Sequence, residues 1–77
     1  MTSTTFHKRQ FLAYHHDGRR IYETLLEKGP MTTKEIIAEN PDLDSTKVRS
    51  AVTRLRNAGL IHGTRIGNGV NIWEAID

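Results

Sequence analysis

The chain has 77 residues, a formal net charge of +2 and no cysteine. A chain of this length forms one small domain without a deep catalytic cleft, and it has neither disulfides nor thiolate metal sites. No apolar run approaches the roughly 20 residues that span a bilayer, and residues 1–11 lack the apolar segment of a signal peptide, so we expect a cytoplasmic protein without a membrane partner.

We interpret residues 1–17 as an N-terminal arm or extra helix and residues 18–77 as the domain. Three roles are open for the first segment: a helix packed on the domain, a contact in a homodimer, or a basic arm that uses His7, Lys8 and Arg9 on phosphates. Large apolar side chains are costly to leave in water, so we expect the segment to be ordered against the domain or a second copy. Its apolar residues do not form one helical stripe: Phe6, Phe11, Leu12, Ala13 and Tyr14.

The first clear helix is predicted at Arg19–Lys28. Asp17 is a plausible N-cap, and Gly29-Pro30 ends the helix. Residues 31–32 are then extended, as a strand of one or two residues. One face of the helix gathers four apolar side chains: Ile21, Tyr22, Leu25 and Leu26.

A second helix is predicted at Thr33–Glu39. Thr32 and Glu35 have the spacing of a capping box, in which each side chain bonds a backbone N–H near the other. Pro41 ends the helix, because proline disfavours helical geometry in the residue before it. A turn of four or five residues separates this helix from the next.

The third helix is predicted at residues 45–58. Asp44 is its N-cap, and Gly59 supplies the positive φ that commonly follows a helix. Its apolar residues recur at helical spacing on one stripe: Val48, Ala51, Val52, Leu55 and Ala58. This helix therefore has one face for the core and one for solvent.

The solvent face of the third helix has the chemistry of a DNA-reading surface. Small polar side chains allow close approach to a major groove, and flanking cations reach phosphates or guanine edges. Between Ser45 and Trp73 there are five cationic residues and no acid, which indicates a polyanion partner. Opposite the apolar stripe lie Thr46, Ser50, Thr53 and Asn57, with Arg49 and Arg56 on one side and Lys47 and Arg54 on the other.

Residues 60–76 predict a β-hairpin. Two segments rich in β-branched residues flank Gly67-Asn68-Gly69, and we favour a three-residue loop with Gly69 at positive φ. That register pairs Thr64 with Ile72 and sets Trp73 across from Gly63. A two-residue Asn68-Gly69 turn, which would put Trp73 near Thr64, stays open. The favoured register gathers on one face Leu60, Ile66, Val70, Ile72 and Ile76.

The order of helix, short extended piece, helix, turn, helix and hairpin resembles winged helix-turn-helix domains of small bacterial, archaeal and phage-type transcriptional regulators. The segment at residues 55–61, Leu-Arg-Asn-Ala-Gly-Leu-Ile, is similar to the pattern with which their recognition helix leads into the wing. The resemblance covers Arg19–Ile76. It implies an α+β, mostly α, fold of three helices and a C-terminal β-hairpin wing, with the extra N-terminal helix as an addition.

The resemblance also implies sequence-specific binding of double-stranded DNA, with a homodimer as the expected form. Arg56 and Arg65 would lie nearer phosphates, and the wing tip with Asn68 would approach a minor groove or backbone. Because the tip carries no lysine or arginine, Arg65 at the base of the wing is the better wing contact. With no ligand-sensing domain, no small-molecule ligand is expected. The residues implied to face the major groove are Ser45, Thr46, Lys47, Arg49, Ser50, Thr53 and Arg54.

Other chemistries find little support in the sequence. His15 and His16 cannot share one helix face, and neither they nor His62 have an evident carboxylate or thiol partner for a metal. There is no glycine-rich phosphate loop, and no nucleophile has a recognisable base, so we expect neither an enzyme nor a cofactor. Trp73 and Tyr22 are more typical of a core than of a base-stacking platform.

A second function of a different class remains open. Winged helices also serve as protein-interaction modules, here an adaptor or inhibitor that docks on an acidic partner surface. The absence of acids between Ser45 and Trp73 favours DNA over this alternative, because a module of that kind would be expected to show glutamate or apolar groups on the same face.

Overall fold

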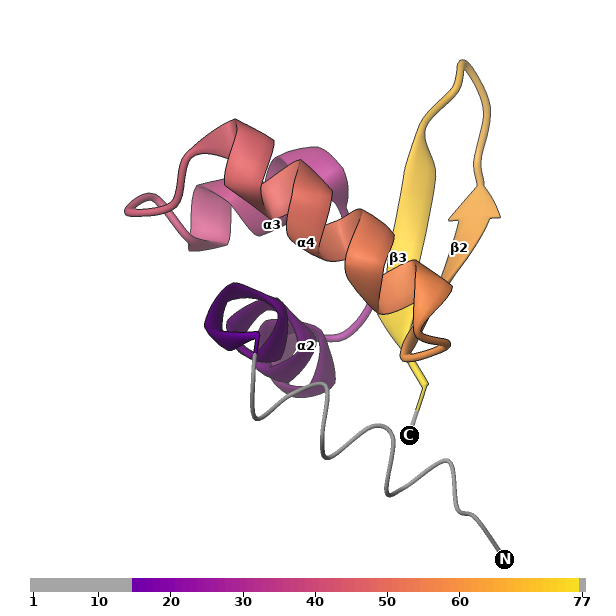
Figure 1. Cartoon of the computed structure of the whole chain (residues 1–77). Helices are drawn as coiled ribbons and strands as arrows, with labels where there is room; N and C mark the ends of the chain where they lie inside the picture. The colour runs from indigo at the N-terminus through magenta and orange to yellow at the C-terminus, as the bar shows by residue number, and fades with distance from the viewer. Residues whose placement is uncertain (1–14, 77) are drawn as a thin grey trace, which may run out of the picture.

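The computed structural model of the chain describes residues 15–76. The elements are α2 (His16–Lys28), β1 (Met31–Thr32), α3 (Thr33–Glu39), α4 (Ser45–Asn57), β2 (Ile61–Arg65) and β3 (Asn71–Ala75). Within these residues three helices, α2 to α4, pack together. A hairpin projects beside α4 (Figure 1). This order confirms the winged helix-turn-helix fold. The expected arm or extra helix lies almost wholly outside the described residues.

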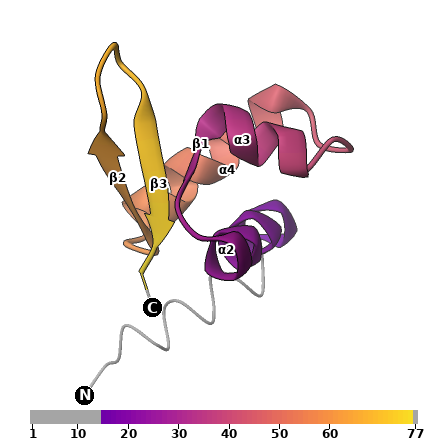
Figure 2. The same cartoon turned by 180° about the vertical axis from the view of Figure 1, so that it is seen from behind.

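The sheet has three antiparallel strands in the order β1-β3-β2. Seen from behind, β1 runs beside β3 and leads directly into α3 (Figure 2). Thr64 pairs with Ile72, and the Ile66 amide donates to the Val70 carbonyl oxygen at 2.9 Å. The three-residue loop is therefore confirmed and the two-residue turn is wrong. Gly69 has the expected positive φ of 77°.

The core lies where α2, α3 and α4 meet the inner face of the hairpin. The Trp73 indole covers Gly63, as the register predicted, and its Nε1–H donates to the Thr33 hydroxyl at 2.9 Å. The Tyr22 hydroxyl donates to the backbone oxygen of Ile76 at 2.8 Å. Both aromatic residues are core residues, as predicted. Twelve buried apolar side chains form this cluster: Ile21, Tyr22, Leu25, Met31, Ile36, Val48, Ala51, Val52, Leu55, Leu60, Ile61 and Trp73.

The apolar face that the register gathers on the hairpin is largely exposed. Leu60 is buried, but Ile66, Val70 and Ile76 are between 42% and 56% exposed. The core is instead built from the opposite face, which carries Trp73. Packing decides which face of the hairpin is buried. The Trp73 indole lies over Gly63, where there is no side chain to obstruct it, and both residues are on the inner face.

Two predictions about α2 are wrong. The helix begins at His16 and not at Arg19, so Asp17 lies in its first turn, where a carboxylate interacts favourably with the helix dipole, and does not cap it. His15 takes the N-cap position without a side-chain cap bond. Leu26, which the sequence places on the same face as the buried Ile21, Tyr22 and Leu25, is 48% exposed.

The predicted boundaries of α3 and α4 agree closely with the structure. The capping box of Thr32 and Glu35 is present, and α3 spans the predicted residues. The Asp44 carboxylate accepts from the Thr46 amide at 3.2 Å, and Gly59 has a φ of 78°. The third helix ends one residue early, since Ala58 is its C-cap and is exposed.

The turn between α3 and α4 is tied to α2 by one ion pair. The Arg20 guanidinium donates two hydrogen bonds of 2.6 Å to the Asp42 carboxylate. These hydrogen bonds are the main cause that lowers the pKa of Asp42 below its ordinary value of 3.8. On the other side of the turn, the buried Asn40 side chain donates to the Ile36 carbonyl oxygen at 2.8 Å.

Gly63→Ala is expected to destabilise the domain. The added Cβ would lie 2.6 Å from Cζ3 of Trp73, so the indole or the strand must shift. Overpacking of this kind costs about 1–3 kcal/mol, which in so small a domain lowers Tm by at least about 4 °C. Thr64→Ala, at the exposed neighbouring position, should change Tm little in the same calorimetric scan. An unchanged Tm for Gly63→Ala would contradict the packing of Trp73.

Asp42→Asn is expected to lower Tm at neutral pH but not in strong acid. Because folding lowers the pKa of Asp42, its contribution to stability is present above the ordinary value of 3.8 and is lost as pH falls through the folded pKa. The Tm difference between parent and variant should therefore shrink as pH falls from about 6 to about 2. Glu74→Gln, an exposed carboxylate on β3, is the control. A difference that is independent of pH would contradict this role of the ion pair.

Candidate nucleic-acid interface

The orientation of α4 follows from its buried stripe. Val48 and Leu55 are fully buried, and Ala51 and Val52 are 5% or less exposed. The helix packs mainly against α2 and also against α3 and β2. Since four side chains on one stripe are fixed in the core, the opposite side of α4 must face solvent along the whole helix.

A strip of small polar side chains runs along the exposed side of α4. We call Thr46, Ser50 and Thr53 the polar strip. The Thr53 hydroxyl donates to the Arg49 carbonyl oxygen at 3.1 Å. The Thr53 side chain therefore presents its methyl group and the lone pairs of its hydroxyl oxygen to solvent. The structure brings five predicted residues around one shallow hollow of about 470 Å³: Thr46, Arg49, Ser50, Thr53 and Arg54.

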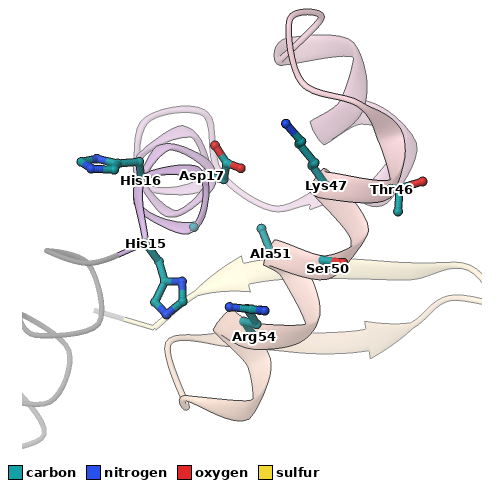
Figure 3. Close-up of a pocket in the computed structure, with 9 residues that line it drawn as sticks. His15, His16, Asp17, Thr46, Lys47, Ser50, Ala51 and Arg54 are labelled. Atoms are coloured by element: carbon teal, nitrogen blue, oxygen red, sulfur yellow. The ribbon is translucent and has the colours of Figure 1, made fainter.

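Two rows of cations flank the polar strip. Lys47 and Arg54 line a hollow toward the start of α2 (Figure 3). Arg56 lines a hollow of about 350 Å³ between α4 and the inner face of the hairpin. Arg49, two helical turns before Arg56, lies on the same side of the helix. The cations therefore border the strip on both sides, as the sequence predicted.

The ion pairs of the described residues leave these cations without a carboxylate partner. They join Arg19 to Glu23, Arg20 to Asp42 and Lys28 to Glu39, on α2, α3 and the turn. None of the cations of α4 and the wing forms an ion pair with a residue between 15 and 76. Their positive charge is thus available to an external anion.

The wing places its cation differently from the prediction. Arg65 is the last residue of β2. One of its guanidinium nitrogens lies 3.9 Å from the point where a Cβ atom would stand if Gly69 carried a side chain. The charge therefore lies beside the wing tip and not at the base, because the long side chain extends over the loop. Asn68 is exposed at the tip with a φ of 42°. Ser45 is exposed in the first turn of α4.

The sequence missed the residues that α2 adds to this surface. His15, His16, Asp17 and Gly18 line the same hollow as Lys47 and Arg54, a space of about 480 Å³. No spacing in the sequence relates these two groups, because the packing of α2 against α4 brings them together.

Comparison with known protein families gives a match over most of the chain. The family model described as "Sugar-specific transcriptional regulator TrmB" matches residues 19–77, most of the chain. The chain belongs to the TrmB family. No curated protein matches it.

The TrmB match covers most of α2, both helices of the helix-turn-helix, the turn between them and the wing. It thus includes every residue of the polar strip and both flanking rows, but not His15 to Gly18. TrmB proteins are transcriptional regulators, which agrees with the charge of this surface. Between residues 15 and 76 no three His, Cys, Asp or Glu side chains are grouped as metal ligands, and no helix there is long and apolar enough to cross a membrane.

Proposed function

We propose that the chain binds double-stranded DNA sequence-specifically, as a small transcriptional regulator that inserts α4 into the major groove. The observation that carries the proposal is the exposed side of α4: a polar strip of small side chains between two rows of cations that have no carboxylate partner among the described residues. Membership of the TrmB family supports the regulatory role.

We infer that this surface fits a major groove. The groove is about 12 Å wide and admits one helix, while a phosphate backbone runs along each of its edges. With the polar strip directed at base edges, Lys47 and Arg54 would reach one backbone and Arg49 and Arg56 the other. Small side chains on the strip let the helix axis come close enough for both rows to bind at once.

We assign roles by position on this surface. Thr53 presents its methyl to a thymine methyl or its lone pairs to an amino group of cytosine or adenine, since its proton is donated to Arg49. Arg56 and Arg65 bind phosphates, and Asn68 approaches a minor groove or backbone at the wing tip. Facing the major groove are Ser45, Thr46, Lys47, Arg49, Ser50, Thr53 and Arg54.

A homodimer stays a prediction, as do the cytoplasmic location and the lack of a small-molecule ligand. A dimer that binds two half-sites would require a centre-to-centre spacing of about one helical turn of DNA. Size measurement of the chain with and without duplex tests this assembly.

Duplex affinity is expected to fall steeply with salt. If the five cations between Ser45 and Trp73 meet phosphates, a plot of log affinity against log salt should have a slope of roughly −3 to −5 per protomer, from about −0.9 per neutralised phosphate. A titration of mixed-sequence duplex at several salt concentrations measures it. No duplex binding at low salt, or a slope near zero, would instead favour the protein-interaction module.

Thr53→Glu is expected to abolish much of the DNA binding without unfolding the domain. The residue is exposed, and glutamate is the better helix former, so Tm should not fall. A carboxylate against the duplex should weaken binding to every sequence by at least about 1–3 kcal/mol, the value of one good base contact, with charge repulsion added.

Two further variants isolate the cause of the weaker DNA binding expected for Thr53→Glu. Thr53→Gln has nearly the same size as Thr53→Glu without the charge, so the difference between them measures repulsion alone. Val52→Asp, one residue away but 3% exposed, should unfold the domain because it buries an unpaired carboxylate. A folded Thr53→Glu protein that binds duplex as well as the parent would show that this side of α4 does not enter the groove.

A further inference from the structure

We propose that Asn71, the first residue of β3, is a DNA-contacting residue that binds the same backbone phosphate of the duplex as Arg56. The inference rests on the proposed function and adds the inner face of the wing to the contact surface. It joins the end of α4 and the wing in one phosphate site.

The observation is the hollow of about 350 Å³ between α4 and the inner face of the hairpin, which we call the wing hollow. The last turns of α4 lie beside the hairpin, and α4 contacts β2 directly (Figure 1). A space of this size has room for one phosphodiester group. The wing hollow is lined by Arg56, Ile61, His62, Gly63, Asn71 and Trp73.

The strand register places Asn71 on the inner face of the wing. Side chains along a strand point alternately to its two faces, so Asn71 shares the face of Trp73, two residues further along β3. The Trp73 indole covers Gly63, while Asn71 pairs with Arg65. Asn71 therefore lies one step nearer the wing tip than the indole, on the side of the hairpin that faces α4.

The two side chains suit a phosphate chemically. The Arg56 guanidinium presents a fork of N–H donors that matches phosphate oxygens, and it has no ion pair with a described residue. The Asn71 side chain adds two N–H donors, is half-buried, and makes no hydrogen bond with any residue between 15 and 76. Its donors are thus available to oxygens that Arg56 attracts.

The wing hollow has no negative charge to oppose an anion. Among the described residues that line it there is no carboxylate. The hollow beside the start of α2 differs in this respect, because the Asp17 carboxylate lines it together with Lys47 and Arg54. On β3, Glu74 lies next to Trp73 and therefore points to the opposite face of the sheet.

The position of the site follows from the proposed docking. Arg49 and Arg56 form the row on the wing side of the polar strip, where the second DNA backbone would pass. A phosphate bound by Arg56 would then lie at the mouth of the wing hollow, within the space that the Asn71 amide also lines.

The first test is a titration of the full chain with several unrelated duplex DNA sequences. Asn71→Ala should weaken binding by about two- to tenfold, the range of one hydrogen bond. The loss should be equal for every sequence, because a phosphate contact carries no base information. Asn71 is neutral, so its loss should leave the salt dependence of the parent, whereas Arg56→Gln should make the log–log slope less steep by about 0.9. Unchanged affinity for Asn71→Ala would overturn the contact.

A matched pair of charge variants tests the location of Asn71 relative to the duplex. Asn71→Asp keeps nearly the same size but puts a carboxylate in the wing hollow, so it should weaken binding more than Asn71→Ala does. Thr64→Asp adds the same charge at an exposed position on the other face of the hairpin, and it should weaken binding less. Equal losses for the two aspartate variants would reflect net charge alone and would contradict the contact.

A double variant tests whether Arg56 and Asn71 share one phosphate. Contacts to the same group are not additive, since the loss of either one lets the phosphate leave the wing hollow. Arg56→Gln combined with Asn71→Ala should therefore weaken binding by less than the product of the two single effects. A loss equal to that product would overturn the shared site.

Misfolding is separated from loss of contact by two further measurements. Trp73 is the single tryptophan of the chain and lines the wing hollow, so its emission in each unbound variant should match that of the parent if the hairpin is intact. Asn71→Lys should tighten duplex binding and steepen the log–log slope by about 0.9, a gain that misfolding cannot imitate. Weaker binding by this variant would contradict a phosphate at Asn71.

Two outcomes separate this inference from the proposed function. If the Asn71 variants bind as the parent does while Thr53→Glu and Arg56→Gln bind more weakly, the Asn71 contact is wrong and duplex binding by α4 stands. If the parent itself fails to bind duplex at low salt, the proposed function is wrong and the contact is wrong with it.

Discussion

The burial of one stripe of α4 is the constraint on which the rest of the structure depends. Val48 and Leu55 are fully buried, so the helix cannot rotate about its axis without exposing them. Successive residues of a helix are about 100° apart around its axis. Burial of Val52 in the core therefore fixes the direction of Thr53 toward solvent. The same hydrophobic contacts that hold the domain together therefore aim the polar strip and its two cationic rows outward.

The wing is held to α3 and α2 by polar contacts made by buried aromatic residues. Trp73 packs flat on Gly63 and donates to Thr33 at the start of α3, while Tyr22 donates from α2 to the end of the hairpin. Each contact satisfies a polar group at the edge of the core and joins the hairpin to a different helix. The position of Arg65 relative to α4 is thereby set by the core and not by the loop at the wing tip.

Charge is divided between the two sides of the molecule. The ion pairs of the described residues join acids and bases on α2, α3 and the connecting turn. The pair of Arg20 with Asp42 is bidentate. The acid-free segment from Ser45 to Trp73 keeps its cations for an external partner. The pairs are exposed and each stabilises the fold little, but none of them involves the cations between Ser45 and Trp73.

The sequence by itself determined the features that depend on neighbouring residues. The capping box of Thr32 and Glu35 sets the start of α3, and the N-cap Asp44 sets the start of α4. The loop at residues 67–69 sets the register of the hairpin. Caps and tight turns can be predicted from sequence because they are governed by local hydrogen bonds and φ. The helical spacing of the apolar residues in α4 predicted which of its residues face solvent, and these include most of the proposed DNA-contacting residues. Only the tertiary structure decided the start of α2, the buried face of the hairpin and the hollow where residues 15–18 meet Lys47 and Arg54. Those features depend on how separate elements pack, and no local spacing encodes the distance between residues that are far apart in the chain.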